Sequence, residues 1–402
     1  MTAIENIKIE KPTKGASIPA KEGIKKAILG ILKKALETES LDAIMIPVKV
    51  PETESYAWVL LKDTVLLENA NPLPPVMTIQ GGKVLSDLTK HGKINKNIAV
   101  ILRPCETRAA VELFKLKQLH FENISLISID CPGAIPLSEY LAEPEKNEKS
   151  FGNILDKWDK DDSVRAICKT CYRFSLPTLT NAPASDLHIG LSGNTKDDVL
   201  LIPVTSKGEK LLEKLDLKPD SSLQKWEIKI NEIKKIKSQR RKKFNQDFKT
   251  EISGPEKFTA VFDGCINCHN CQSVCPICYC QQCYFDSATT KLSSEDYFRR
   301  AKDRGALRFP LDTILFHLGR MSHMALSCVS CGACEDACPM SISVSQVFSL
   351  VGEQTQQAFN YTPGINRGET LPLQDYLEDE FCEVETPSEC DPTNSNEVKE
   401  NV

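Results

Sequence analysis

Short apolar runs of strand length recur along the first half of the chain, and polar residues bound each of them. The stretches LDAIMIPVKV (41–50), KNIAVIL (96–102), NISLISID (123–130) and DDVLLIPV (197–204) have this form. Runs of four to eight residues rich in Ile, Val and Leu are typical of buried strands. We therefore expect a buried sheet in this half of the chain.

Segments with helical periodicity separate these runs. In KEGIKKAILGILKKALE (21–37) the apolar residues recur three or four positions apart, and ETRAAVELFKLKQL (106–119) follows the strand that ends before Arg103. Alternation of strands and helices predicts an α/β domain. No G-x-G-x-x-G motif follows a strand here, so the pattern does not support a Rossmann dinucleotide site.

The pattern changes in the second half of the chain. Residues 225–249 are basic with scattered Ile, which predicts a helix that is solvated or docks on an acidic partner, with RNA or membrane binding as the alternative. The segment LDTILFHLGRMSHMALS (311–327) also has helical spacing, and a capping box from Ser293 to Asp296 predicts a helix before it. From Asp375 the chain is acidic, and we expect this tail to order only against a partner.

Composition narrows the class of protein. The chain has 402 residues, of which 41% are hydrophobic, and a formal net charge of −5, which argues weakly against nucleic acid as the main partner. Its first residues contain no apolar core of a signal peptide, and no apolar run approaches the ~20 residues that span a bilayer. We therefore expect a cytoplasmic protein that does not span a membrane.

The chain contains 17 cysteines, which are unevenly placed. Disulfides are rare in the reducing cytoplasm, so ligation of metal or clusters is the better interpretation. Two runs have the form C-x2-C-x2-C-x3-C-P, which is the bacterial iron–sulfur motif, whose fourth cysteine ligates the other cluster in two-cluster proteins. We expect one 4Fe–4S cluster on Cys265, Cys268, Cys271 and Cys338, and a second on Cys328, Cys331, Cys334 and Cys275. Structural zinc is the alternative, and it fits a threefold run poorly.

The remaining cysteines fall into three sets. Cys105, Cys131, Cys168 and Cys171 are the four cysteines of the first half, the number that one cubane cluster needs, with zinc or unrelated buried thiols as alternatives. Between the two runs, Cys278, Cys280 and Cys283 form either a further metal site or thiols around the first cluster. Cys382 and Cys390 lie in the acidic tail and are not expected to be ligands. Between the runs, His317 and His323 are expected to be packing or surface histidines.

A glycine pair, Gly81 and Gly82, precedes a probable helix that extends to Leu88. Glycines at a helix N-terminus let backbone N–H groups approach a phosphate or a ring, although a plain turn explains them equally well. Further along the chain follow strand-Pro-Cys at Cys105, strand-Cys-Pro-Gly at Cys131, and the Cys168-x2-Cys171 pair.

This order of motifs resembles the β subunit family of coenzyme F420 hydrogenases and dehydrogenases, which includes the formate dehydrogenase β subunit of methanogens. The likeness covers about residues 55–245. The resemblance implies FAD, a 4Fe–4S cluster and hydride exchange with a deazaflavin. It places the following residues at or near the flavin: Gly81, Gly82, Lys83, Pro104, Asp186, Gly190 and Gly193. Helices between the two cysteine runs resemble the α-helical ferredoxins of heterodisulfide reductase and succinate dehydrogenase subunits.

We therefore expect an α/β flavin-binding domain followed by an α-helical ferredoxin-like 4Fe–4S domain. The expected parts are an FAD and 4Fe–4S domain at 1–224, a basic helical linker at 225–253, a two-cluster domain at 254–365 and an acidic tail at 366–402.

The expected function is that of an oxidoreductase subunit that exchanges hydride with coenzyme F420 or NAD(P)H at FAD. It would pass single electrons through 4Fe–4S clusters to or from a partner subunit of a heterodisulfide reductase, hydrogenase or formate dehydrogenase complex. Two alternatives remain. The chain could be an electron-transfer subunit without a substrate site, or a zinc-rich binding module.

Overall fold

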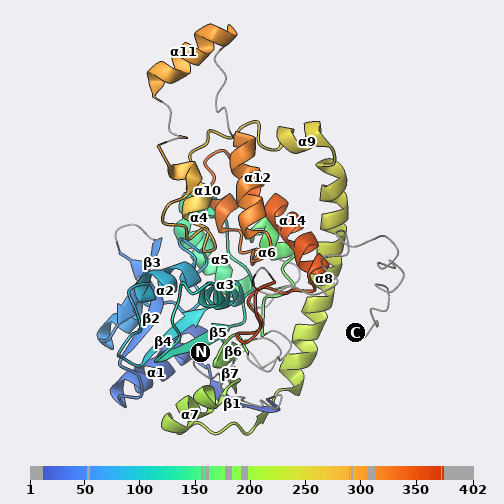
Figure 1. Ribbon diagram of the computed structural model, residues 1–402. Coiled ribbons are helices and arrows are strands. Elements are labelled where there is room, and N and C mark those ends of the chain that lie inside the picture. Colours follow the sequence, from blue (N-terminus) through green and yellow to red (C-terminus); the bar gives the residue numbers. More distant parts are fainter. Residues whose placement is uncertain are drawn as a thin grey trace, which may run out of the picture. The chain divides into compact units, whose positions relative to one another are not determined.

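The structure is a computed structural model, shown in Figure 1. It describes residues 12–51, 55–154, 158, 163–176, 183–191, 198–288, 290, 293–306, 313–372 and 374. Contacts between Cα atoms group the chain into two units, Met1–Arg367 and Gly368–Val402. The fold described below lies within the first unit. The predicted division into parts 1–224, 225–253 and 254–365 stays a prediction.

A mixed sheet of eight strands forms the α/β part, in the order β3-β2-β4-β5-β6-β7-β1-β8. Strands β2, β4, β5 and β6 run parallel, while the remaining neighbours pair antiparallel. The bounds are β1 (Lys14–Pro19), β2 (Ala43–Val50), β3 (Ser55–Leu61), β4 (Ile98–Leu102), β5 (Ile124–Ile129), β6 (Leu187–Gly190), β7 (Asp198–Pro203) and β8 (Ser221–Ser222).

The two central strands explain why the sheet has this order. Every residue of β4 and β5 is buried, as expected for parallel strands covered on both faces. Helix α3 (Pro104–Lys115) makes the crossover between them. The expected α/β architecture is confirmed, and the four strand-like runs of the sequence correspond to β2, β4, β5 and β7.

Helices cover both faces of the sheet. Ile28 and Leu32 of α1 pack into the core on one face, and Leu85 of α2 with Leu113 of α3 pack on the other. The helices of this part are α1 (Ile24–Glu37), η1 (Val65–Asn69), α2 (Gly81–Thr89), α3, α4 (Leu137–Ala142), α5 (Pro144–Ile154), α6 (Ala166–Lys169) and α7 (Ser206–Lys214).

The basic segment forms helix α8 (Gln224–Glu251), as the sequence predicts, and it is not wholly solvated. Its first turns pack against the sheet through Trp226 and Ile230. Its last turns place Phe248 in the core of the cysteine-rich region. At 28 residues the helix is roughly 42 Å long, so one rigid element joins the two regions.

The cysteine-rich region is built from short helices, and no strand is assigned to it among the described residues of 254–367. Its elements are α9 (Pro255–Ala260), α10 (Asn270–Ser273), η2 (Tyr284–Asp286), α11 (Ser294–Arg304), α12 (Thr313–Met324), α13 (Ala333–Asp336) and α14 (Val344–Ala358). Ser293 caps α11 by accepting from the backbone N–H of Asp296, as its capping box predicts.

The two cysteine runs have the same local backbone. In the first run Asn267 and His269, on either side of Cys268, have φ of 55° and 60°. In the second run Ser330 and Gly332 have φ of 56° and 79° at the equivalent positions. Left-handed residues turn the chain sharply, and both runs make the same pair of turns directly before α10 and α13 begin.

Candidate metal centres and ligand cavity

The structure places Cys338, the fourth cysteine of the second run, near the first three cysteines of the first run. Burial raises the pKa of Cys271 to about 11 against the lowering effect of Arg320, and the charges of Cys265, Cys268 and Cys338 raise it further. Burial likewise raises the pKa of Cys265, with contributions from Cys268 and Cys338. The charges of these four thiols therefore act on one another. We refer to the four as group A, which consists of Cys265, Cys268, Cys271 and Cys338.

A second group, group B, contains Cys328, Cys331 and Cys334. Burial and then the charges of Cys331 and Cys328 hold the pKa of Cys334 well above its usual range, although Arg320 lowers it. The fourth expected member, Cys275, is buried, and its sulfur accepts a hydrogen bond from the thiol of Cys278. The structure thus shows Cys328, Cys331 and Cys334 acting on one another, while Cys275 as the fourth ligand of this group stays a prediction.

A third group, group C, lies at the carboxyl edge of the sheet. Cys105 follows β4 in the first turn of α3, and Cys131 follows β5, so adjacent parallel strands bring both to the same edge. Cys168 and Cys171 come from α6 and its end. Burial raises the pKa of Cys131 to about 11, with opposing charge from Arg103 and further raising by Cys168 and Cys171.

Group B has a cysteine near group C and another near group A. Burial, Glu106 and then Cys331 of group B raise the pKa of Cys105 in group C. The charge of Cys271 in group A acts on Cys334 of group B. Group B therefore lies between groups C and A. Thiols that raise one another's pKa in a buried site need a positive centre before all of them can lose their protons, which is what iron in a cluster supplies.

Buried arginines accompany the thiols. Arg320 of α12 is 3% exposed, and its Nη1 donates to the Sγ of Cys271 at 3.0 Å. Its Nη2 donates to the carbonyl of the same residue at 3.1 Å. His317 lies on the same helix with its Nε2 3.4 Å from the Sγ of Cys265. Burial first, and then Arg320, lower the pKa of His317 to about 4, so this ring is neutral near pH 7. His323 is exposed, so the two histidines are a packing and a surface residue, as expected.

Polar contacts join the sheet to the cysteine-rich region. Arg165 lies 3.0 Å from the carboxylate of Asp336, and its Nη1 donates to the carbonyl of Cys331 at 3.3 Å. Arg108 of α3 donates to the carbonyl of Val329. Lys83 donates to the carbonyl of Cys275 at 3.5 Å. These contacts fix group C against group B.

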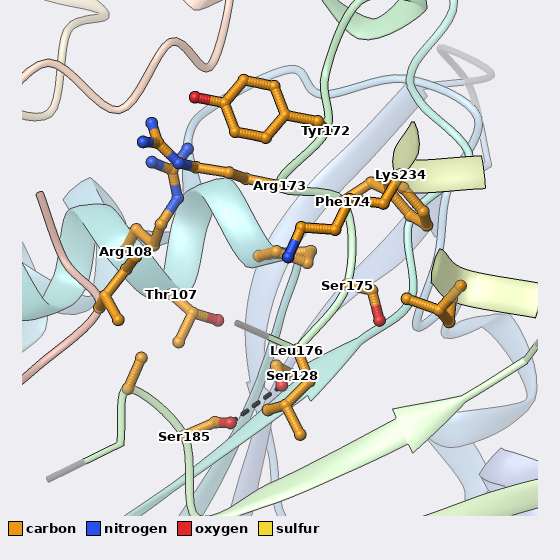
Figure 2. A pocket seen from close by; sticks show the side chains of 14 residues that line it. Thr107, Arg108, Ser128, Tyr172, Arg173, Phe174, Ser175, Leu176, Ser185 and Lys234 are labelled. Atoms are coloured by element: carbon orange, nitrogen blue, oxygen red, sulfur yellow. Dashed lines mark hydrogen bonds between the residues drawn. The ribbon is translucent and has the colours of Figure 1, made fainter. Parts of the chain in front are cut away.

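A partly open cavity lies beside group C, shown in Figure 2. It encloses about 720 Å³ of empty space, including its open mouth. Its lining combines the start of α3, the end of β5, the segment 172–176 and one face of α8. A smaller adjoining cavity shares Arg108, Tyr172 and Arg173 with it and reaches Cys171.

Three cations line the cavity: Arg108, Arg173 and Lys234. Burial, and next the charge of Arg108, lower the pKa of Arg173. Burial and the charge of Arg173 lower the pKa of Lys234. Arg108 is 4% exposed, yet its Nε and Nη1 atoms have no hydrogen-bond partner. Because buried polar atoms are normally bonded, these donors fit a ligand that carries negative charge.

The residues that the resemblance places at the flavin do not all line this cavity. Pro104 lines it, and Asp186 follows the lining residue Ser185. The carboxylate of Asp186 already accepts from the backbone N–H of Leu126 at 2.8 Å and from the hydroxyl of Thr205 at 3.1 Å. Gly190 packs under the ring of Trp226, where a Cβ would lie 2.9 Å from the indole nitrogen. Gly193 lies outside the described residues.

The glycine pair lies at the start of α2, where the helix packs tightly. A Cβ on Gly82 would lie 2.8 Å from the carbonyl oxygen of Glu106, and one on Gly81 would lie 2.5 Å from the ring of Trp58. The backbone N–H of Gly81 donates to the carboxylate of Glu106 at 3.0 Å. Lys83 reaches the cysteine-rich region instead of the cavity. Close packing of α2 on α3 therefore explains this pair.

A buried polar network beneath the cavity has no counterpart in the sequence predictions. Asp130, Ser128 and His188 are 0%, 3% and 0% exposed. His188 lies 3.0 Å from Asp130 through Nε2 and 2.7 Å from the hydroxyl of Ser128 through Nδ1. Ser128 and His188 are register partners on β5 and β6. Their sequence signal was a polar residue within each apolar strand, which becomes informative only when the pairing is known.

Among the described residues, no three His, Cys, Asp or Glu side chains converge tightly enough to hold a single metal ion. No helix in the described part of the chain is long and apolar enough to cross a membrane.

Comparison with known proteins defines the class. The 4Fe–4S dicluster domain family matches residues 261–342, which contain both cysteine runs. Together with the α/β sheet, this match indicates an iron–sulfur protein, and the relatives below are named as oxidoreductase subunits.

The particular relatives are formate dehydrogenase subunits. The chain is 25% identical over 373 residues to the F420-dependent formate dehydrogenase subunit beta of Methanocaldococcus jannaschii, covering 85% of this chain and 92% of that protein. It is 28% identical over 372 residues to the F420-dependent formate dehydrogenase 1 subunit beta of Methanococcus maripaludis, covering 85% and 90%. The chain is therefore a homologue of these β subunits, which confirms the resemblance read from its motifs.

Among solved structures, the chain matches one from the F420-reducing [NiFe] hydrogenase complex of Methanosarcina barkeri. The TM-score is 0.43 and the identity is 13%, and the match covers 62% of this chain and 96% of the other.

Proposed function

We propose that this chain is the flavin-containing iron–sulfur subunit of a larger redox complex. It exchanges hydride with a two-electron carrier and passes single electrons to or from a partner subunit of the formate dehydrogenase, hydrogenase or heterodisulfide reductase type. Coenzyme F420 is the favoured carrier because both relatives are named as F420-dependent, and NAD(P)H is the alternative.

The observation that carries the proposal is the line of three cysteine groups that begins at the cationic cavity. Cys171 of group C lines the small cavity that adjoins the larger one. Cys105 of group C then interacts with Cys331 of group B, and Cys334 of group B with Cys271 of group A. Redox centres held in this order would connect the cavity to the far side of group A.

The donor sets fit 4Fe–4S clusters, which Cys thiolates hold in fours. We assign Cys265, Cys268, Cys271 and Cys338 to one cluster, and Cys105, Cys131, Cys168 and Cys171 to another. The second cluster of the dicluster domain takes Cys328, Cys331 and Cys334. Its fourth ligand is Cys275, whose sulfur can keep the hydrogen bond from the thiol of Cys278 when it binds iron.

The cavity cations fit the negatively charged part of FAD or of its carrier. Arg108 offers two unpartnered N–H groups, and Arg173 and Lys234 add charge beside it. When bound, FAD accepts two electrons as hydride and returns them singly, while each cluster carries one electron. Arg108 and Arg173 orient the ligand, and the buried walls limit access of water to it. The glycines Gly81, Gly82 and Gly190 contribute packing in this scheme.

The test is anaerobic mixing of the iron- and sulfide-reconstituted protein with reduced F420 and, separately, with NADH or NADPH. We expect acid treatment to release FAD, and one carrier alone to bleach the visible spectrum within the mixing time. Iron analysis should give about twelve atoms per chain. Cys131→Ser should lose about four of them, whereas Cys280→Ser, at an exposed thiol outside the three groups, should keep all.

A preparation that carries its iron but releases no FAD and accepts hydride from none of the carriers would contradict hydride exchange. The chain would then be an electron-transfer subunit only. Zinc in place of iron would contradict the iron–sulfur assignment itself.

A further inference from the structure

The buried network beneath the cavity is a continuous hydrogen-bonded chain that opens on the cavity wall. The hydroxyls of Ser185 and Ser128 are 3.0 Å apart, and both residues line the cavity, as Figure 2 shows. The Ser128 hydroxyl lies 2.7 Å from Nδ1 of His188, whose Nε2 lies 3.0 Å from Asp130. Two hydroxyls thus lead from the cavity to the fully buried imidazole of His188.

Donors surround the carboxylate of Asp130. Its Oδ1 accepts from the hydroxyl of Ser175 and lies 3.0 Å from Nε2 of His188. The indole N–H of Trp226 donates at 2.8 Å, and the backbone N–H of Leu191 also donates at 2.8 Å. An ionised Asp130 can only accept, so Nε2 of His188 must carry a proton.

The second ring nitrogen of His188 is therefore the one that changes state. In the structure the hydroxyl of Ser128 donates to that of Ser185, the direction that goes with a proton on Nδ1. In the neutral ring Nδ1 accepts from Ser128, and the Ser185 hydroxyl turns to donate to Ser128. In the charged ring Nδ1 donates to Ser128, and both hydroxyls reverse. Asp130 is the charged group that faces His188, while Trp226 of α8 and Ile202 of β7 are its neutral neighbours. On the cavity side the charged groups are Arg108, Arg173 and Lys234.

We propose that Ser185, Ser128 and His188 relay one proton between the cavity and the buried imidazole, a path we call the serine–histidine relay. The inference rests on the proposed function, because it needs a flavin-like ring in the cavity. Electron transfer to single-electron centres leaves a proton behind, and the relay gives that proton a defined place to go. The path uses none of the groups that would ligate iron.

In the direction of carrier oxidation, the relay takes one proton from the reduced ring. Two electrons pass from the reduced, anionic ring to two oxidised iron–sulfur centres, and one N–H bond of the ring breaks. Ser185 accepts this proton and gives its own to Ser128, whose proton forms an N–H bond at Nδ1 of His188. His188 returns the proton along the same hydroxyls to water in the open cavity, because hydride from the carrier rebuilds the N–H bond of the ring and needs no proton from the relay.

The experiment uses the full chain, reconstituted anaerobically with iron, sulfide and FAD, and follows reoxidation of the flavin by the clusters after hydride transfer. We expect Ser128→Ala and Ser185→Ala each to slow this step about 100-fold near pH 7, the lower end of what positioned acid–base groups contribute. Both should lose the solvent deuterium isotope effect of the parent protein. Ser128→Thr keeps a hydroxyl and should restore most of the rate.

Two comparisons separate relay from packing. Ser86→Ala removes a hydroxyl that is bonded to the carbonyl of Gln118, away from the cavity, and should leave rate and isotope effect unchanged. Infrared difference spectra of protein with isotope-labelled histidine should show imidazole bands change between oxidised and reduced states. We expect His188→Gln to abolish those changes while FAD and iron content stay at the parent level.

The outcomes are distinct. If the parent protein binds no FAD or accepts no hydride, the proposed function fails and the relay fails with it. If the parent protein does both, but Ser128→Ala reoxidises at the parent rate with the same isotope effect, the relay alone is wrong. Unchanged imidazole bands on reduction would also overturn it.

Discussion

At the scale of single residues, the buried arginine of α12 is the clearest example of a side chain whose chemistry depends on its neighbours. Arg320 bonds to the sulfur and the carbonyl of one cysteine and lies over the rings of Phe316 and Phe348. Its charge favours negative charge on the nearby sulfurs. An arginine in this position should stabilise the reduced, more negative form of a cluster.

Replacement of Arg320 by Met should therefore lower the reduction potential of the centre held by group A. The reason is that both a hydrogen bond to the Sγ of Cys271 and a buried positive charge are lost. A redox titration followed by electron paramagnetic resonance measures the change. Arg300→Met, on the exposed surface of α11, is the matched control and should leave all potentials unchanged. An unaltered potential in the Arg320 variant would show that the arginine only packs.

At the scale of elements, α5 is anchored to the edge of the sheet by one carboxylate. Glu148 lies 2.5 Å from the amine of Lys49 on β2 and accepts from the hydroxyl of Tyr56 on β3 at 2.6 Å. Burial alone would raise its pKa, but these two partners outweigh burial and lower it. A carboxylate with a lowered pKa stabilises the fold above its usual pKa, and this contribution is lost as pH falls through the folded value.

The free energy of unfolding should thus decrease as the pH falls below the usual glutamate value of about 4.3, in part because Glu148 takes up a proton. Glu148→Gln should be less stable than the parent chain at pH 7, and the difference should shrink on acidification. Urea titrations at several pH values measure this. The exposed Glu145→Gln on the same helix should follow the parent at every pH. A constant gap for Glu148→Gln would contradict the assignment.

The strands also show which elements can be predicted from the sequence alone. Apolar runs identified β2, β4, β5 and β7 because these strands are buried along their length. In contrast β3 has only two buried residues among seven and β6 has only four residues, so neither has a strong signal. Cysteine spacing indicated the two runs because each motif is local in the sequence, whereas the exchange of the fourth cysteine between the runs stays a prediction. The cations of the cavity were not predicted, because Arg108, Arg173 and Lys234 meet only in the folded chain.

The glycine pair shows that a sequence pattern can suggest a ligand site where the structure uses it for packing. Gly81 and Gly82 have the pattern of a ligand-binding turn, and in the structure the missing side chains make room for Trp58 and for the backbone of α3. A sequence pattern that permits close approach does not say what approaches. The same holds for Gly190 under Trp226.

At the scale of the whole unit Met1–Arg367, the sheet and the cysteine-rich region are held together by buried ions. Asp336 accepts from the backbone N–H of Leu137 at 3.0 Å and pairs with Arg165, and both side chains are at most 9% exposed. Arg241 of α8 pairs with Glu353 of α14 at 3.0 Å. Such pairs cost much when one partner is removed, because a buried charge is left without compensation.

Asp336→Ala should destabilise the protein by about 3–5 kcal/mol. Arg165 would remain buried without its carboxylate, beside the carbonyl of Cys331. Urea unfolding followed by circular dichroism gives the number. Glu232→Ala, which breaks an exposed pair with Lys229, should cost no more than about 1 kcal/mol. Equal effects of the two substitutions would mean that the regions do not depend on this contact.

The place of Cys338 beside Cys265, Cys268 and Cys271 has a consequence for biogenesis. A nascent chain that has left the ribosome only as far as the first run lacks a thiol that group A requires, and the missing one arrives 73 residues after Cys265 (338 − 265). If group A holds a cluster as proposed, its loading must wait until translation of the region is nearly finished. A ribosome-stalled fragment that ends before Cys338 would carry only three of the four thiols of group A.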